Sequence, residues 1–468
     1  MNNIKGINIT LYVISILYFV GMFQLTSIGS FGVQPSYVGI VLLFSLFFYH
    51  FITNKLTVNL NPISSAKSVL LLQASAGLAL VFVISNPNAE VIQFIKSYSH
   101  FIFLTLFALT LGVINLENKV FLNIFRIWLI FSIILNIFGI YQLFARAFEL
   151  PLAWIELNNV SLSGNEEQEF QQLSLKFKNF YRATSIFSEP SALAGFNLTI
   201  VGILIAPMFK SESYHIFKSK GFINFIFILS IITLFVTFSL TAVMGLGLLS
   251  LAYMMYNRNI NYIKIFKTIA IVILLMIVAD MFIVSYFETS LLELFYTRIS
   301  NVLGFSKEGI VGESFTTRSN NFKSSFDVWM KNPLIGVGLG HTKYFSEVSY
   351  SDYGIMHSLM ETGIIGGFFF VMIFISLLSE MLLLKNRIHE LPSESHYLLN
   401  SAFYVTFILI GTNFISGNSF INLYLWFYLG ILISIVTTVK YQLGDNLSPI
   451  NYFKKKSSKA ISIGADKI

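Results

Sequence analysis

Long apolar stretches recur along the whole of this chain and limit its possible folds more than any other feature. A helix that crosses a lipid bilayer needs about 20 predominantly apolar residues, because each residue advances the helix by about 1.5 Å. Twelve such stretches can be identified, at roughly 8–28, 34–54, 67–85, 91–114, 119–145, 190–208, 221–238, 239–257, 265–287, 354–384, 397–416 and 419–440. We therefore predict an all-α polytopic membrane protein with about twelve transmembrane helices.

The composition supports this class and excludes several others. Hydrophobic residues make up 55% of the chain and charged residues 11%, whereas a soluble domain is about 25% charged. Cysteine is absent, which rules out disulfides and cysteine metal sites, and the seven histidines lack metal-ligand spacing. We expect no metal and no cofactor. The net charge of +7 does not indicate nucleic-acid binding, because the cations collect in short loops and in the tail.

The distribution of Lys and Arg predicts the orientation in the membrane. One set of connections, together with the tail, holds most of the cations, whereas the alternate short loops near 29–33, 86–90 and 417–418 hold none. Cytoplasmic loops carry the excess of Lys and Arg. Both termini are therefore predicted to be cytoplasmic.

This orientation places two long loops outside the membrane, where we expect them to contain short helices. They carry several cations, and an anionic ligand is one reason for cations on the outer face. The predicted divisions are an N-terminal bundle of five spans (1–145), the first outer loop (146–189), middle spans (190–287), the second outer loop (288–353), C-terminal spans (354–440) and a basic cytoplasmic tail (441–468).

The first outer loop carries an apolar periodicity and an arginine. Phe170, Leu173, Phe177 and Phe180 recur at spacings of 3, 4 and 3, which predicts one face of a helix that lies on the membrane surface or caps the bundle. Arg182 follows and either extends its charge to the membrane interface or meets a ligand.

The loop then leads into the sixth span. Pro190 suits the first turn of a helix, where its missing N–H costs nothing. Glu189, directly before it, is a candidate for binding the substrate.

In the second outer loop, the segment "TRSNNFKSSFDVWMKNP" predicts a helix that ends before Pro333. Arg318 continues an apolar stripe formed by Phe322, Phe326 and Trp329. The arginine either caps this stripe or points into the same cavity.

A glycine-rich segment, "NPLIGVGLGH" at 332–341, follows that helix. It lacks the GK[ST] of a phosphate-binding P-loop and lies on the wrong side of the membrane for ATP. Gly336, Gly338 and Gly340 instead predict a tight turn whose backbone approaches another group closely. Together with His341 they are candidates for contacting the substrate.

The tenth span begins with a histidine and a carboxylate one turn apart. His357 and Glu361 share a helix face at the outer mouth of this span. Such a pair either has a structural role or forms part of a site together with the outer-loop arginines. Gly363, Gly366 and Gly367 give the same helix a close-packing surface.

Two segments resemble the O-antigen polymerase and O-antigen ligase superfamily. They are "RATSIFSEPSALAGF" and the series "R…W…NPLIGVGLG…HSLMETGIIGG" that bounds the second outer loop, and the resemblance covers about 180–375. One difference is that "SLTAVMG" (239–245) lacks the arginine that members often carry after Ser or Thr at the start of a middle span.

The resemblance implies a glycosyltransferase at the outer face of the bacterial cytoplasmic (inner) membrane. Its donor would be a saccharide on undecaprenyl pyrophosphate, and a chain-length regulator and a flippase are implied partners. Carried over to this sequence, Arg182 and Arg318 engage pyrophosphate or glycan and His357 activates the acceptor. Glu361 and Glu189 are our further candidates for binding the substrate.

Three functions remain open at this point. Polymerisation of O-antigen or a related surface polysaccharide is favoured by "FSEPS". The alternatives are O-antigen ligation to an acceptor and the flipping or transport of lipid-linked oligosaccharide. A transporter built of repeats predicts two similar halves, and we find no such repeat. Lys96 and Arg126 are charged residues inside predicted spans. Charges at such positions often mark a transport pathway, so transport remains an alternative.

Overall fold

The computed structural model describes residues 5–21, 23–28, 31–56, 63–87, 89–157, 170–172, 174, 176–177, 180–209, 216–257, 262–288, 290–302, 309–345, 354–415 and 420–444. Its α-helices are α1 (Lys5–Leu17), α2 (Pro35–Ile52), α3 (Ser64–Leu78), α4 (Leu80–Ser85), α5 (Val91–Val113), α6 (Asn118–Ala147), α8 (Pro190–Phe209), α9 (Lys220–Val236), α10 (Leu240–Tyr256), α11 (Tyr262–Phe287), α12 (Leu291–Val302), α13 (Gly309–Lys331), α14 (Gly354–Lys385), α15 (Ser393–Ile415) and α16 (Leu423–Gln442). Short 3-10 helices are η1 (Tyr18–Val20), η3 (Thr342–Tyr344) and η4 (Ile388–Glu390).

The helices confirm the predicted class of protein. Among the described residues, eight helices are long and apolar enough to cross a membrane. The other four predicted spans coincide with shorter apolar helices, at Lys5–Val20, Lys220–Val236, Leu240–Tyr256 and Met276–Tyr286. A multi-pass helical membrane protein is thus confirmed, and the number of twelve crossings stays a prediction.

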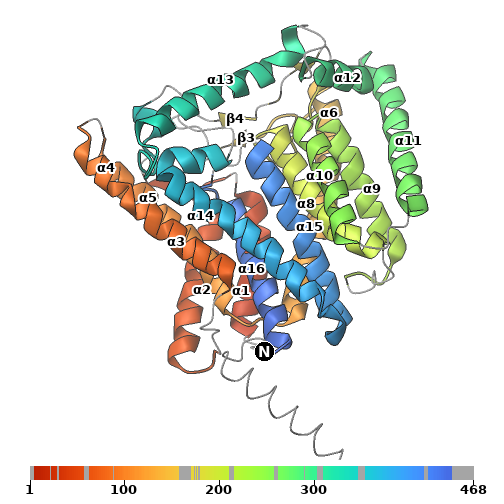
Figure 1. The fold of residues 1–468 in the computed structure, drawn as a ribbon. Coiled ribbons are helices and arrows are strands. Elements are labelled where there is room, and N and C mark those ends of the chain that lie inside the picture. Colours follow the sequence, from red (N-terminus) through yellow and green to blue (C-terminus); the bar gives the residue numbers. More distant parts are fainter. Residues whose placement is uncertain are drawn as a thin grey trace, which may run out of the picture.

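The bundle has a buried centre and a lipid-facing periphery. α16 packs against α5, α15 against α8, and α14 against α3 (Figure 1). The apolar window of α16 is 89% buried inside the protein, whereas that of α2 is 28% buried. α16 therefore belongs to the protein core, and α2 presents most of its apolar surface outward, as expected of a helix in contact with lipid.

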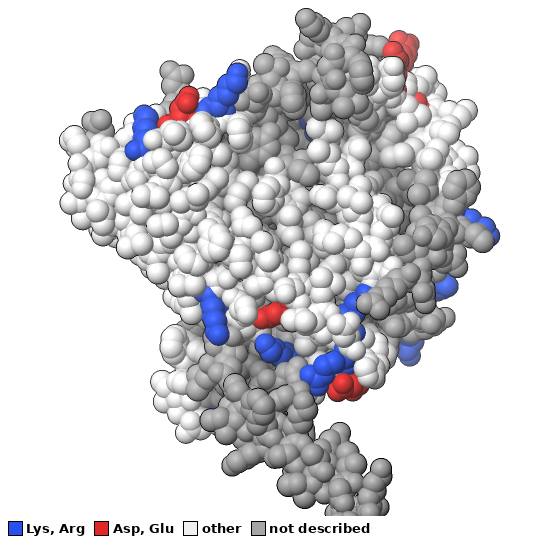
Figure 2. Space-filling view, in the orientation of Figure 1, with Lys and Arg blue, Asp and Glu red and all other residues white. Residues whose placement is uncertain are grey.

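Charge is distributed as a membrane protein requires. Lys and Arg cluster along the lower end of the face in Figure 2, and the surface above them, over α3 and α14, is uncharged almost to its upper edge. An uncharged band between charged ends matches the hydrocarbon layer of a bilayer.

The first outer loop corrects one prediction. Residues 170–181 were expected to form a helix, but the described parts are extended: β4 (Phe170–Gln171) pairs with β3 (Glu156–Leu157), and β5 (Lys176–Phe177) pairs with β6 (Phe180–Tyr181). The prediction was wrong because aromatic residues spaced by three and four also suit short strands joined by a tight turn. One further ladder joins β1 (Thr26–Ile28) to β2 (Phe31–Val33).

The second outer loop contains the predicted helix. α13 ends at Lys331, two residues before Pro333, and runs across the top of the bundle (Figure 1). However, Phe322 and Phe326 are 46% and 42% exposed, and Val328 is buried instead. The expectation that the stripe faces an inner cavity is therefore wrong for these two phenylalanines. Arg318 lies on α13, two turns before the buried Ser325. Its side chain is not among those that the structure describes.

Candidate active site

α14 is broken near its outer end, and the break organises the site. Gly363 has φ 66° and ψ −170°, which no helix contains. A break of this kind leaves backbone groups without their usual partners four residues away. The freed carbonyl oxygen of Met360 accepts from the Val337 amide at 2.8 Å, and that of Glu361 accepts from the Gly338 amide at 3.1 Å.

The other side of the break is closed by the same loop. The Ile364 amide donates to the Pro333 carbonyl oxygen at 2.8 Å, and the Ile365 amide donates to that of Leu334 at 3.3 Å. The segment 333–338 therefore lies inside the broken helix turn and pairs with two N–H groups and two carbonyl oxygens of α14. Buried backbone groups are costly when they are left unpaired, so this pairing stabilises the break.

The glycines of the loop permit this close approach. Gly336, Gly338 and Gly340 have φ values of 77°, 99° and 74°, a region that favours glycine. A Cβ on Gly336 would overlap the backbone of Glu361, and one on Gly363 would overlap that of Leu334. The predicted tight turn with close backbone approach is confirmed, and the group approached is the protein's own helix α14.

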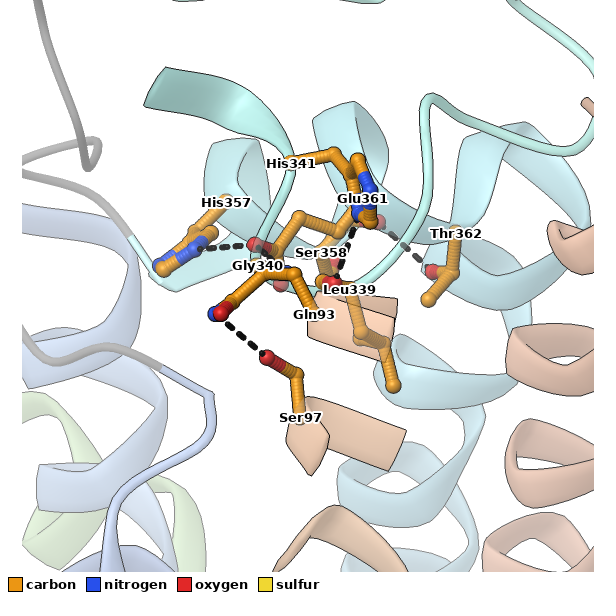
Figure 3. Close-up of polar contacts among 9 residues, drawn as sticks. All are labelled: Gln93, Ser97, Leu339, Gly340, His341, His357, Ser358, Glu361 and Thr362. Atoms are coloured by element: carbon orange, nitrogen blue, oxygen red, sulfur yellow. Dashed lines mark hydrogen bonds and ion pairs between the residues drawn. The ribbon is translucent and has the colours of Figure 1, made fainter. Parts of the chain in front are cut away.

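The loop also binds the Glu361 side chain. Glu361 Oε1 accepts from the Gly340 amide at 2.8 Å and lies 3.3 Å from His357 Nε2. Figure 3 shows both contacts, with His357 and Glu361 on the outer segment of α14 and Gly340 on the loop that enters it. The pair predicted from i,i+4 spacing is confirmed, and a backbone amide from the second outer loop now fixes its carboxylate.

His357 is buried, and one of its ring nitrogens has no hydrogen-bond partner among the described residues. The residue is 6% exposed, and its ring meets the Phe420 ring edge-to-face at 5.5 Å. The contact with Glu361 favours the tautomer that carries the proton on Nε2. Nδ1 then presents its lone pair, and it has no hydrogen-bond partner among the described residues. A buried imidazole oriented by a carboxylate can accept a proton from a hydroxyl group.

His341 lies in the same loop but uses its ring differently. It is fully buried, with Nε2 2.9 Å from the carbonyl oxygen of Glu90 and Nδ1 3.1 Å from that of Leu339. These contacts tie the loop to the start of α5. Burial, together with the Glu90 carboxylate, raises the pKa of the neighbouring Tyr344 phenol to about 12. The geometry of His341 is that of a structural anchor, and its predicted contact with substrate stays a prediction.

Arg182 lies elsewhere, at the outer end of α9. It is 8% exposed, and its Nε donates to the Thr237 carbonyl oxygen at 2.9 Å. Thr237 precedes by two residues the segment 239–245, where the resemblance led us to expect an arginine. The guanidinium of Arg182 thus reaches the start of this middle span from the first outer loop.

Sequence reasoning treated Arg146 only as a loop cation, but the structure buries it beside Arg182. Its guanidinium donates to the carbonyl oxygen of Ala153 at 2.9 Å, to Gln172 Oε1 at 2.9 Å and to Thr184 Oγ1 at 2.6 Å, and it also bonds the Arg182 carbonyl. These acceptors are all neutral. The position of Arg146 at the last turn of a span was the only signal in the sequence.

Glu189 lines a cavity of about 180 Å³. Pro190 is the first residue of α8, as predicted, so Glu189 directly precedes that helix, where its side chain accepts from the Ser191 hydroxyl. The cavity reaches inward between α8, α15 and α16 and is also lined by three tyrosines that sequence reasoning did not select: Tyr18, Tyr424 and Tyr428. No pattern in the sequence brings these segments together.

Lys96 and Arg126, the charges predicted inside spans, both lie among the described residues. Lys96 is exposed on α5. Arg126 is held by the Ile216 carbonyl oxygen at 2.7 Å and by Asn123 Oδ1 at 2.7 Å. Within the described ranges, no group of three His, Asp or Glu side chains is arranged to hold a metal ion.

Comparison with known proteins gives one match. A family model described as O-antigen ligase matches residues 225–371, whereas no curated protein matches the chain. The matched segment begins in α9 and ends in α14, so it includes Arg318, the glycine loop and the pair His357 and Glu361. Arg182 and Glu189 lie before it.

Proposed function

We propose that this chain, whose residues 225–371 match a family model described as O-antigen ligase, polymerises oligosaccharide units carried on undecaprenyl pyrophosphate. The reaction takes place at the outer face of the cytoplasmic membrane and builds O-antigen or a related surface polysaccharide. The family implies a membrane glycosyltransferase-like enzyme, and the polymerase activity and the lipid-linked donor are our proposal.

The observation that carries the proposal is the contact chain from Gly340 to Glu361 to His357. The Gly340 amide fixes the Glu361 carboxylate at 2.8 Å, and that carboxylate orients the His357 ring at 3.3 Å. Nδ1 then accepts the proton of an acceptor sugar hydroxyl as the hydroxyl oxygen attacks the anomeric carbon of the donor. A sugar hydroxyl is a weak nucleophile and gains from a positioned base.

The departing group sets the second requirement. As the new glycosidic bond forms, the bond between the anomeric carbon and the pyrophosphate oxygen breaks, and the electron pair leaves with undecaprenyl pyrophosphate. Guanidinium groups suit this developing charge because they stay protonated and donate in a fork. We assign this role to Arg318 of the second outer loop, with Arg182 as the second candidate.

Deletion of the protein followed by profiling of the surface glycan tests the proposal. A polymerase deletion leaves single repeat units attached to their acceptor and removes the longer chains. Complementation with the wild-type chain should restore the chains, and complementation with His357→Ala should not.

O-antigen ligation is the second candidate, favoured by the description of the matching family model. Loss of a ligase gives a different glycan profile: nothing is attached to the acceptor, and lipid-linked polymer accumulates. If the deletion changes neither the chain length nor the attachment of the glycan, both candidates are wrong and transport is the remaining alternative.

A further inference from the structure

The cavity beside Glu189 has a composition that the proposed reaction does not yet use. It is lined by the aromatic rings of Tyr18, Tyr424 and Tyr428 and by the polar side chains Glu189, Ser191, Thr199, Thr412 and Asn422. We propose that it binds one uncharged ring of the acceptor saccharide. This inference rests on the proposed glycosyl transfer and adds an acceptor subsite to it.

The lining chemistry matches a sugar ring and does not match pyrophosphate. Aromatic rings offer apolar faces to the C–H side of a pyranose, while carboxylate, amide and hydroxyl groups bond its hydroxyls. The cavity lining includes one carboxylate and no Lys or Arg. The hydroxyl oxygen of Tyr424 is buried and has no hydrogen-bond partner among the described residues.

The size of the cavity suits a single sugar ring. A volume of about 180 Å³ accommodates several water molecules. That is room for one pyranose. The Glu189 carboxylate favours hydroxyl donors and repels the carboxylate of a uronic acid, so we specify an uncharged sugar.

The position of the cavity suits an acceptor. Asn422 lines the cavity and lies two residues after Phe420, whose ring contacts the His357 ring. The segment 420–422, directly before α16, therefore contacts the proposed base at Phe420 and lines the cavity at Asn422. The donor sugar carries pyrophosphate and needs the arginines. The acceptor needs only a base beside its hydroxyl, and so we assign the cavity to the acceptor.

Binding can be measured on the purified full-length protein without any turnover. The Trp128 ring lies 5.0 Å from the Tyr428 ring and 6.2 Å from the Tyr18 ring, so its fluorescence should report occupancy of the cavity. The probes are methyl glycosides of neutral hexoses and of N-acetylhexosamines, with methyl glucuronide as the charged comparison. A ligand of about a dozen non-hydrogen atoms should half-saturate the change in roughly the millimolar range.

A cavity-filling variant and a matched control sharpen the test. Gly195 lines the cavity on α8, and the nearest atom to an added Cβ is the Thr412 methyl at 3.8 Å. Gly195→Leu should fit and should weaken glycoside binding at least tenfold. Gly247→Leu is the control, because Gly247 lies on α10 with nothing within 4 Å of an added Cβ, and it should bind as wild type does.

Three outcomes decide the inference. If no uncharged glycoside gives a saturable change, or if Gly195→Leu binds as tightly as Gly247→Leu, the cavity is not a sugar site. A bound glycoside should also become an alternative acceptor when lipid-linked units are supplied, and mass spectrometry detects its glycosylated product. If it binds but is not glycosylated while the natural unit is polymerised, the acceptor assignment is wrong.

Failure of the proposed function gives a different pattern. In that case the wild-type protein binds glycosides but turns over no lipid-linked unit under any condition. His357→Ala separates the two further, since His357 does not line the cavity. It should retain glycoside binding and lose transfer.

Discussion

Glu361 Oε1 joins His357 to the second outer loop, lying 3.3 Å from His357 Nε2 while it accepts the Gly340 amide at 2.8 Å. The carboxylate is 1% exposed and belongs to the short helical segment above the break at Gly363. One buried carboxylate thus fixes the orientation of a ring whose other nitrogen has no hydrogen-bond partner among the described residues. The position of that ring therefore depends on the glycine-rich segment 332–341, which contributes the Gly340 amide.

The first prediction is a loss of turnover on replacing His357. Removal of a general base lowers the rate by about 10²–10⁴-fold, whereas loss of one neutral hydrogen bond costs about 0.5–1.5 kcal/mol, roughly tenfold or less. We expect His357→Ala and His357→Gln to show the larger loss in an in vitro polymerisation assay. His389→Gln is the control, because His389 lies exposed in η4. If both His357 variants keep more than about a tenth of wild-type turnover, His357 is not the base.

Glu361→Gln tests the orienting role of the carboxylate. Glutamine keeps an oxygen for the Gly340 amide but removes the charge that faces His357, so the fold should persist while kcat falls. We expect the loss to be smaller than that of His357→Ala and the KM for the lipid-linked unit to change little. In a double variant with His357→Ala, the Glu361 substitution should cause no further loss in kcat. An additive loss in the double variant would mean that Glu361 acts on the substrate directly.

Gly336→Ala tests whether the loop is inserted in α14. The added Cβ would overlap the backbone of Glu361 and Thr362 at a φ of 77°, and such a change costs more than about 1 kcal/mol. We expect a lower melting temperature by intrinsic fluorescence in detergent. Gly247→Ala is the matched control, since it has open space around its Cβ and helix propensity favours alanine by about 1 kcal/mol. Equal melting temperatures for the two variants would contradict the inserted loop.

The sequence predicted those features that depend on local pattern. Long apolar runs located the membrane helices, Pro333 located the end of α13, and i,i+4 spacing located the pair His357 and Glu361. Each signal lies within one segment, because a helix repeats every 3.6 residues and an interior proline removes a helix hydrogen bond and so favours a helix end or a kink.

The remaining features depend on contacts between distant segments. From the sequence, Gly363 and Gly366 were both interpreted as close-packing residues of α14. This interpretation holds for Gly366, where an added Cβ would lie 3.2 Å from Ser75 Oγ on α3. At Gly363 the helix is broken instead, and only the contact with the distant loop 333–338 distinguishes the two glycines. The cavity likewise combines α8, α15 and α16, and no periodicity along one segment reports such a meeting.

The orientation in the membrane can be tested with single cysteines, because the chain contains none. Asp327 is exposed on α13, and His389 is exposed in η4 between α14 and α15. We expect Asp327→Cys to react with an impermeant maleimide in cells whose outer barrier has been permeabilised. His389→Cys should react only after lysis, since the loop after α14 is predicted to be cytoplasmic. The reverse pattern would overturn the orientation and, with it, the placement of His357 at the outer face.

The last prediction separates structure from catalysis among the outer-loop arginines. Arg146 is buried, bonds the carbonyl oxygens of Ala153 and Arg182 and the side chains of Gln172 and Thr184, and lies 4.1 Å from the Trp154 ring centroid. Lysine keeps the charge but cannot reproduce the planar fork. A hydrogen bond to a charged group contributes about 1.5–3 kcal/mol, and lysine would lose some of these four. We therefore expect Arg146→Lys to lower the melting temperature clearly while turnover per folded molecule stays near wild type.

Arg387→Lys is the control for this substitution. Arg387 pairs with Glu390 at 3.3 Å, with the Arg387 side chain 40% exposed, and exposed pairs of this kind contribute little to stability. Its melting temperature should not change. If Arg146→Lys instead melts as the wild type does and loses turnover, then the Arg146 guanidinium acts on the substrate, and the clamp for the departing pyrophosphate includes Arg146 beside Arg182.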